Sequence, residues 1–94
     1  MNSNERAELR KLAQKENSVA QVGKGGVSPA VLTSIRNVLT ARELIKVTVL
    51  PSCEKSSREV ADELASTLKA DVVQVVGGKF VLYKKNPNKK KIVL

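Results

Sequence analysis

The feature that most constrains the fold is the spacing of apolar residues, which changes repeatedly between a period of two and a helical period. Residues 44–50 alternate apolar and polar side chains as a β-strand does, and Pro51 ends that strand. Lys46 and Thr48 should therefore share one face of the strand, opposite its apolar residues. Helical spacing before and after this segment predicts a strand that lies between two amphipathic helices.

The rest of the chain follows the same two spacings. Helices are expected over residues 4–16, from Ser28 to about Arg42 and from Ser56 or Ser57 to about Lys69, and further strands over residues 18–23, 71–76 and 79–84. Strands separated by helices favour parallel pairing through right-handed crossovers, whereas a Gly-Gly turn before the last strand predicts an antiparallel hairpin. The order αβαβαββ predicts one domain over residues 1–94: a two-layer α/β fold with a mixed four-stranded sheet and three helices.

The charge of the chain predicts an anionic partner. Seventeen Lys and Arg residues against nine Asp and Glu residues give a net charge of +8, which favours nucleic acid first and an acidic membrane surface second. Residues 1–53 have eight basic and four acidic side chains, residues 54–71 three and five, and residues 72–94 six and none. The acidic middle segment is expected to face away from the anion, and a basic tail covers residues 85–94.

Several kinds of chemistry lack the residues that they need. The chain has no His, and Cys53 is its only Cys, so the usual proton shuttle and a Cys-based zinc site are both missing. We interpret Cys53 as an ordinary small side chain and expect no catalytic residue, metal, cofactor or small-molecule substrate. A lone thiol, a polar N-terminus and no apolar run of about 20 residues predict a cytoplasmic protein without a membrane span. We also expect a monomer.

The loop Gly23-Lys24-Gly25-Gly26 lies between a predicted strand and the start of a predicted helix. Glycines allow a phosphate to approach the backbone closely, and N–H groups at the start of the next helix would point towards it. The G-x-x-G spacing is that of an RNA-binding loop that clamps the nucleic-acid backbone, but a plain tight turn has the same composition. Phe80 and Tyr83 are the only aromatic residues, so an aromatic stacking platform is missing, and we interpret Tyr83 first as a packing residue.

Three groups of residues occur together in an order and spacing that are specific in combination. They are Gln21-Val22-Gly23-Lys24-Gly25-Gly26-Val27, then Ala41-Arg42-Glu43-Leu44-Ile45-Lys46-Val47, then Val73-Gln74-Val75-Val76-Gly77 with Val81-Leu82-Tyr83. With these motifs the chain resembles the CRM domain (chloroplast RNA splicing and ribosome maturation), and in particular its stand-alone bacterial YhbY/YqeI-like members, over about residues 5–94. At residues 15–18 it departs from the family pattern, because this segment is shorter and lacks a proline.

The resemblance implies a fold similar to the C-terminal domain of translation initiation factor three. It also implies RNA binding through the glycine loop and nearby basic residues, and association with precursors of the large ribosomal subunit during their maturation. The candidate RNA-binding residues in and beside the loop are Gly23, Lys24, Gly25, Gly26, Arg36, Arg42 and Lys46, and a second patch comprises Lys84, Lys85, Lys89, Lys90 and Lys91. Only the loop and Lys46 lie in motifs that match the family; the other residues follow from charge and expected position.

Two other functions are compatible with the same sequence. One is a constitutive structural component of the ribosome or of another ribonucleoprotein, because size and charge suit it equally well. The other is a basic adaptor that binds an acidic protein or a membrane surface through the Lys-rich tail. The sequence favours a non-enzymatic, cytoplasmic RNA-binding factor over both.

Overall fold

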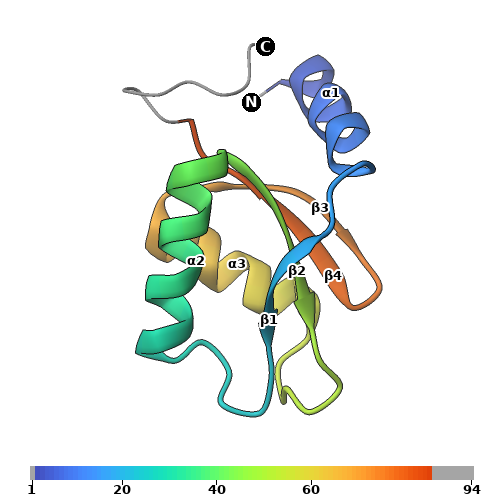
Figure 1. Ribbon diagram of the computed structural model, residues 1–94. Helices are drawn as coiled ribbons and strands as arrows, with labels where there is room; N and C mark the ends of the chain where they lie inside the picture. The colour runs from blue at the N-terminus through green and yellow to red at the C-terminus, as the bar shows by residue number, and fades with distance from the viewer. Residues whose placement is uncertain (1, 86–94) are drawn as a thin grey trace.

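Four strands form one mixed sheet in the computed structural model, which describes residues 2–85 (Figure 1). The helices are α1 (Ser3–Ala13), α2 (Pro29–Arg42) and α3 (Ser57–Leu68), and the strands are β1 (Ser18–Val22), β2 (Leu44–Val49), β3 (Asp71–Val76) and β4 (Lys79–Tyr83). The predicted order αβαβαββ and the predicted α/β class are confirmed. The first helix ends at Ala13, three residues before the predicted end.

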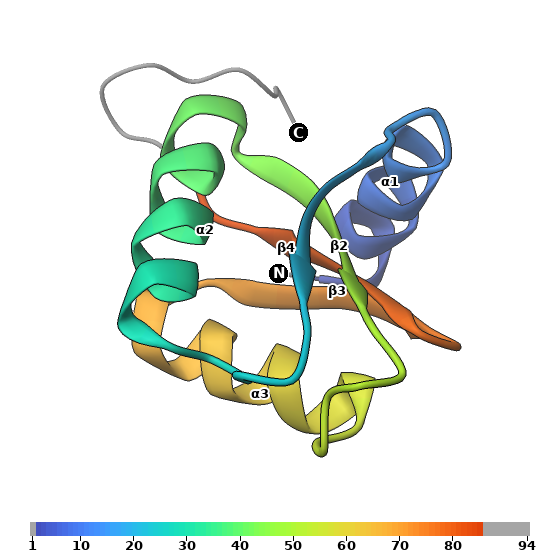
Figure 2. The ribbon, with the colours of Figure 1, turned by 60° about the horizontal axis from the view of Figure 1, so that its bottom comes forward.

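The strand order β1-β2-β4-β3 explains where the helices lie. β1 is parallel to β2, and β4 lies between β2 and β3 and is antiparallel to both. The two crossovers, β1-α2-β2 and β2-α3-β3, therefore move across the sheet in the same direction. Because such crossovers are right-handed, both place their helix on the same face, and Figure 2 shows α2 and α3 together there.

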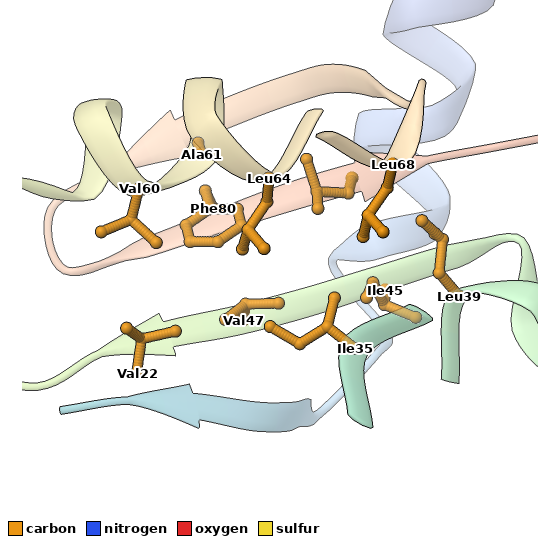
Figure 3. Packing of buried hydrophobic residues seen from close by; sticks show 11 residues of the cluster. Val22, Ile35, Leu39, Ile45, Val47, Val60, Ala61, Leu64, Leu68 and Phe80 are labelled. Atoms are coloured by element: carbon orange, nitrogen blue, oxygen red, sulfur yellow. The ribbon is translucent and has the colours of Figure 1, made fainter. Parts of the chain in front are cut away.

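This face of the sheet and the two crossover helices enclose the main hydrophobic core. Its buried side chains are Val22, Ile35, Leu39, Ile45, Val47, Val60, Ala61, Leu64, Leu68, Phe80 and Leu82. Figure 3 shows Leu64 of α3 and Ile35 of α2 pointing into the same space above the central strands. Ile45 and Val47 are buried as the alternation of β2 predicts, with Lys46 on the opposite face.

Helix α1 packs on the opposite face of the sheet, so it adds a partial third layer to the two that were expected. Its Leu9 and Ala13 form a second buried cluster with Leu44, Val73, Val81 and Tyr83. With 11 residues, about 16 Å at 1.5 Å per residue, α1 covers only part of this face. The remaining part is open.

A β-bulge in β3 completes the docking of α1. The pairing of β3 with β4 shifts between Val72 and Gln74, which leaves Val73 as the extra residue. Nη1 of Arg6, on α1, donates hydrogen bonds to the carbonyl oxygens of Val72 at 2.6 Å and Val73 at 3.2 Å. The guanidinium therefore contributes hydrogen bonds at the place where the regular ladder is interrupted.

Side-chain caps define the helix starts. Asn2 and Glu5 form a capping box on α1, Ser28 caps α2, and Ser56 and Glu59 form a capping box on α3. Hydrogen bonds from Ser56 hold the pKa of Glu59 below its usual value.

Within residues 2–85, no helix has the length and apolar character needed to cross a membrane.

Two leucines three residues apart on α1 test how the helix docks. Leu9 is fully buried whereas Leu12 is 36% exposed. We expect Leu9→Ala to lower the free energy of unfolding by about 2–5 kcal/mol through a cavity under α1. Leu12→Ala, the matched control, should change it by about 0.5 kcal/mol or less. Urea denaturation measures both, and equal losses would contradict the observed orientation of α1.

The second cluster should make stability depend on alkaline pH. Burial raises the pKa of Tyr83, and the negative charges of Glu43, Glu5 and Asp71 raise it further. The folded state thus disfavours the phenolate, so stability is complete below the ordinary tyrosine pKa near 10 and is lost as pH rises through the higher folded-state pKa. Tyr83→Phe should lose less stability than the wild type between about pH 9 and 12. If the stability of both proteins fell in parallel with pH, this prediction would be wrong. Because the chain has one Tyr and no Trp, ultraviolet absorbance also measures the ionisation of Tyr83 directly.

Candidate nucleic-acid interface

The glycine loop connects β1 to α2 at the end of the sheet drawn lowest in Figure 1. The N–H group of Gly26 donates a hydrogen bond to the carbonyl oxygen of Gly23 at 2.9 Å, which closes a turn around Lys24 and Gly25. Gly26 has a φ of +62°, a left-handed conformation that strongly favours glycine. The last glycine of the loop therefore has a structural requirement of its own.

The first and the third residues of the loop have different surroundings. A Cβ atom at Gly23 would lie 3.3 Å from Cδ1 of Leu50 and 3.4 Å from Oγ of Ser52, so a side chain there would press on the loop that follows β2. A Cβ atom at Gly25 would have no heavy-atom neighbour within 4 Å, and its φ is not positive. The left-handed φ thus accounts for Gly26, and the closeness of Leu50 and Ser52 favours a glycine at Gly23, but neither reason applies to Gly25.

The start of α2 contributes less to this site than the sequence predicted. The Ser28 hydroxyl accepts the N–H of Val31 at 3.2 Å, and the Ser28 carbonyl accepts that of Leu32 at 2.9 Å. Pro29 has no N–H group. Ser28 and Pro29, the residues that begin the helix well, therefore leave Ala30 as the only first-turn residue whose N–H group remains for a ligand.

Lys24 and the backbone on either side of it form the exposed tip of the loop. Lys24 and Gly25 are exposed, and within residues 2–85 their N–H groups donate no hydrogen bond and the Lys24 ammonium has no ion pair. An ammonium next to free backbone donors can bind an anionic oxygen from two directions. This arrangement suits a phosphate better than a base edge.

The predicted cations beside the loop are distributed more widely than expected. Arg36 is exposed in the middle of α2, and Arg42 ends that helix. A helix of 14 residues is about 21 Å long, so Arg42 lies at the opposite end of the molecule from Lys24. One terminal oxygen of Glu16 lies 4.0 Å from Nη1 of Arg42, a weak and exposed ion pair.

Arg42 instead lies near the second predicted patch. The N–H group of Lys84 donates to the carbonyl oxygen of Glu43 at 2.8 Å, which places the end of β4 next to the end of α2. Lys84 and Lys85 are both exposed at this end. The other members of the predicted patch, Lys89, Lys90 and Lys91, lie outside the described residues.

Lys46 belongs to a third location, on the sheet face opposite α2. It lines a pocket with Lys79, a residue that the sequence reasoning did not single out. The pairing that brings them together, Lys46 with Val81 and Thr48 with Lys79, depends on the register of β2 against β4. Alternation within residues 79–83 does put Lys79 and Val81 on one face, and this is the signal that could have identified Lys79.

The acidic residues of segment 54–71 lie before and on α3 and at the start of β3. α3 begins at the end of the sheet that carries the glycine loop, and Asp71 begins β3 at the other end. Two cations of the acidic segment form ion pairs with its carboxylates. Lys55 Nζ lies 2.7 Å from Glu63 Oε1, and Arg58 Nε lies 3.2 Å from Asp62 Oδ2. The hydrogen bond to Glu63 raises the pKa of Lys55.

In the part of the chain that the structure describes, no group of three or more acidic or Cys side chains could hold a metal ion. Cys53 is half-buried and packs against the main core, as an ordinary small side chain does. The candidate site therefore consists of the exposed loop tip, Arg36 in the middle of α2 and two separate groups of cations. One group is Arg42 with Lys84 and Lys85, and the other is Lys46 with Lys79.

Comparison with known proteins finds similar sequences that match most of the chain. The chain is 42% identical over 86 residues to "Probable RNA-binding protein YqeI" of Bacillus subtilis, covering 92% of this chain and 90% of that protein. It is 34% identical over 76 residues to an "RNA-binding protein" of Haemophilus influenzae, covering 81% and 77% of the two chains.

The fold has a close counterpart among solved structures. The solution structure of the hypothetical protein SAV1595 from Staphylococcus aureus superposes with a TM-score of 0.83 at 33% sequence identity, over 100% of this chain and 98% of that one. Residues 1–84 match the CRS1 / YhbY (CRM) domain. The glycine loop, the central strand and the final hairpin thus occur in the fold that the resemblance implied, and the chain belongs to the CRS1 / YhbY (CRM) domain family.

Proposed function

We propose that this protein is a non-enzymatic RNA-binding factor that associates with precursors of the large ribosomal subunit and assists their maturation in the cytoplasm. Its relatives in Bacillus subtilis and Haemophilus influenzae bear names that describe RNA-binding proteins. The observation that carries the proposal for this chain is the loop tip, where Lys24 and unbonded N–H groups surround a Gly25 that the fold does not require. RNA backbone is the polyanion that such a tip suits.

The distribution of cations indicates how the protein would hold RNA. Lys24 lies at one end of α2, whereas Arg42, Lys84 and Lys85 lie at the other end, with Arg36 between them. These residues would contact phosphates that lie up to about 21 Å apart, the length of α2. We expect the basic residues of the tail to extend the second patch. Binding of this kind follows the shape of structured RNA and is sensitive to salt.

Sedimentation through a ribosome gradient tests the ribosomal assignment. A tagged copy should travel with free large subunits and their precursors at low salt and leave them as salt rises, because its contacts are ionic. Presence on translating ribosomes at one copy each would support a structural component instead. Recovery with soluble proteins at both salt concentrations would contradict ribosome association. Deletion of residues 86–94 should weaken binding only in part, whereas an adaptor that relies on the tail would lose it all.

Gly25 tests whether the loop contacts RNA. Gly25→Glu should lower affinity for large-subunit ribosomal RNA about fivefold or more, since one like charge near 4 Å from a phosphate costs about 1 kcal/mol in water. The free energy of unfolding should change by about 0.5 kcal/mol or less, because the side chain enters open space. A filter-binding titration and a urea denaturation curve measure the two quantities.

Gly25→Gln is the matched control, with the same size and no charge. We expect it to bind RNA more tightly than Gly25→Glu and to unfold like the wild type. Wild-type affinity in both variants would show that RNA does not contact the loop. Unfolding of both variants would show that Gly25 is needed for the fold.

A further inference from the structure

The part of the second sheet face that α1 leaves open contains a pocket. It has a volume of about 250 Å³ and lies where α1 ends, between the C-cap residue Gln14 and strands β2, β4 and β3. Small-molecule pockets commonly measure about 300–1,000 Å³, so this one suits a single ring system rather than a whole cofactor. Phe80 of the main core and Val81 of the α1 cluster also line it, whereas the proposed loop contact does not use it.

Strand register builds the pocket from two rows of side chains. Lys46, Val81 and Gln74 lie side by side on β2, β4 and β3, and Thr48, Lys79 and Val76 form the next row. The bulge in β3 is essential here. If β3 paired with β4 without a bulge, Val73 would be opposite Val81 and Gln74 opposite Phe80. Gln74 would then face the main core, and Val76 would also change face.

The lining combines an apolar surface with polar groups that can bind in the plane of a ring. Val81 is buried and Val76 is 61% exposed, an unusually large exposed fraction for an apolar side chain of this chain. Gln14 and Gln74 contribute side-chain amides, each of which can donate and accept hydrogen bonds. A flat heterocycle with donors and acceptors on its edge would satisfy both kinds of surface.

Two cations define the charge of the pocket. Lys46 and Lys79 are diagonal neighbours across β2 and β4, with Cβ atoms roughly 7–8 Å apart or less, as such pairs are. No carboxylate lines the pocket, and neither lysine has an ion pair within residues 2–85. The two like charges repel each other, and one phosphate between them would relieve that repulsion.

We propose that this pocket binds one unpaired nucleotide of RNA, with the base against Val76 and Val81 and its phosphate between Lys46 and Lys79. Gln14 and Gln74 then hydrogen-bond to the edge of the base. The inference rests on the proposed RNA-binding function and adds to it an unstacked nucleotide, which the backbone contacts of the loop do not require. Phe80 also lines the pocket but is buried in the main core, so the aliphatic Val76 and Val81 replace the exposed aromatic rings that usually stack on RNA bases.

Nuclear magnetic resonance with free mononucleotides tests the pocket without reference to any particular RNA. Titration with AMP, GMP, CMP and UMP should shift the side-chain amide signals of Gln14 and Gln74 and the methyl signals of Val76 and Val81, for at least one nucleotide. Inorganic phosphate is the control and should leave the methyl signals in place. Equal shifts with phosphate alone would show that the pocket binds only an anion, which would overturn the proposal. The absence of shifts with every nucleotide would overturn it as well.

Substitution of Val76 connects the pocket to RNA binding. Val76→Glu should lower affinity for large-subunit ribosomal RNA about fivefold or more by placing a carboxylate near the phosphate, whereas Val76→Thr keeps the shape and should remain within about twofold. Val76 is exposed on a strand, so a urea denaturation curve should show that both variants are folded. If Val76→Glu binds like the wild type while Gly25→Glu does not, the pocket inference fails and the proposed function stands. If the wild type does not bind this RNA, the proposed function fails, and the nucleotide titration alone decides the pocket.

Discussion

The two faces of the central strands β2 and β4 have different environments, and the rest of the structure depends on this difference. One face buries Ile45, Val47, Phe80 and Leu82 under α2 and α3. Because both crossovers move in the same direction across the sheet, their right-handed sense leaves the other face without a crossover helix. The short N-terminal helix covers only part of that second face. Apolar burial thus secures the fold on one side, and polar and charged side chains remain available on the other.

The bulge in β3 connects the docking of α1 to the open part of the second face. Arg6 donates hydrogen bonds to the carbonyl groups on either side of the shift in register, and Val73 packs under the helix. The same shift directs Gln74 and Val76 away from the main core. The bulge therefore helps to hold α1 in place and also turns two lining residues, Gln74 and Val76, towards the proposed nucleotide pocket. Both effects follow because side chains alternate strictly between the faces of a strand.

The glycine loop shows how a turn requirement and a binding role can be separated. Close packing against Leu50 and Ser52 explains Gly23, and a left-handed φ explains Gly26. Gly25 has neither constraint, so neither the turn nor packing within the fold requires a glycine there. Few N–H groups at the start of α2 remain for a ligand, because the Ser28 side chain accepts the N–H of Val31 and Pro29 has no N–H group. Lys24 and Gly25 stay exposed at the tip, and within residues 2–85 their N–H groups donate no hydrogen bond.

Local patterns in the sequence determined the helices, the strands, the caps and the position of the glycine loop, because spacing and turn chemistry act over a few residues. The buried Ile45 and Val47 opposite Lys46 were predictable for the same reason. Three features needed the tertiary structure. The insertion of β4 between β2 and β3 depends on pairing across the chain, and the separation of Lys24 from Arg42 depends on the direction of α2. Lys46, Lys79, Gln74 and Val76 line the same pocket because of strand register and a bulge, which no spacing within one strand reveals.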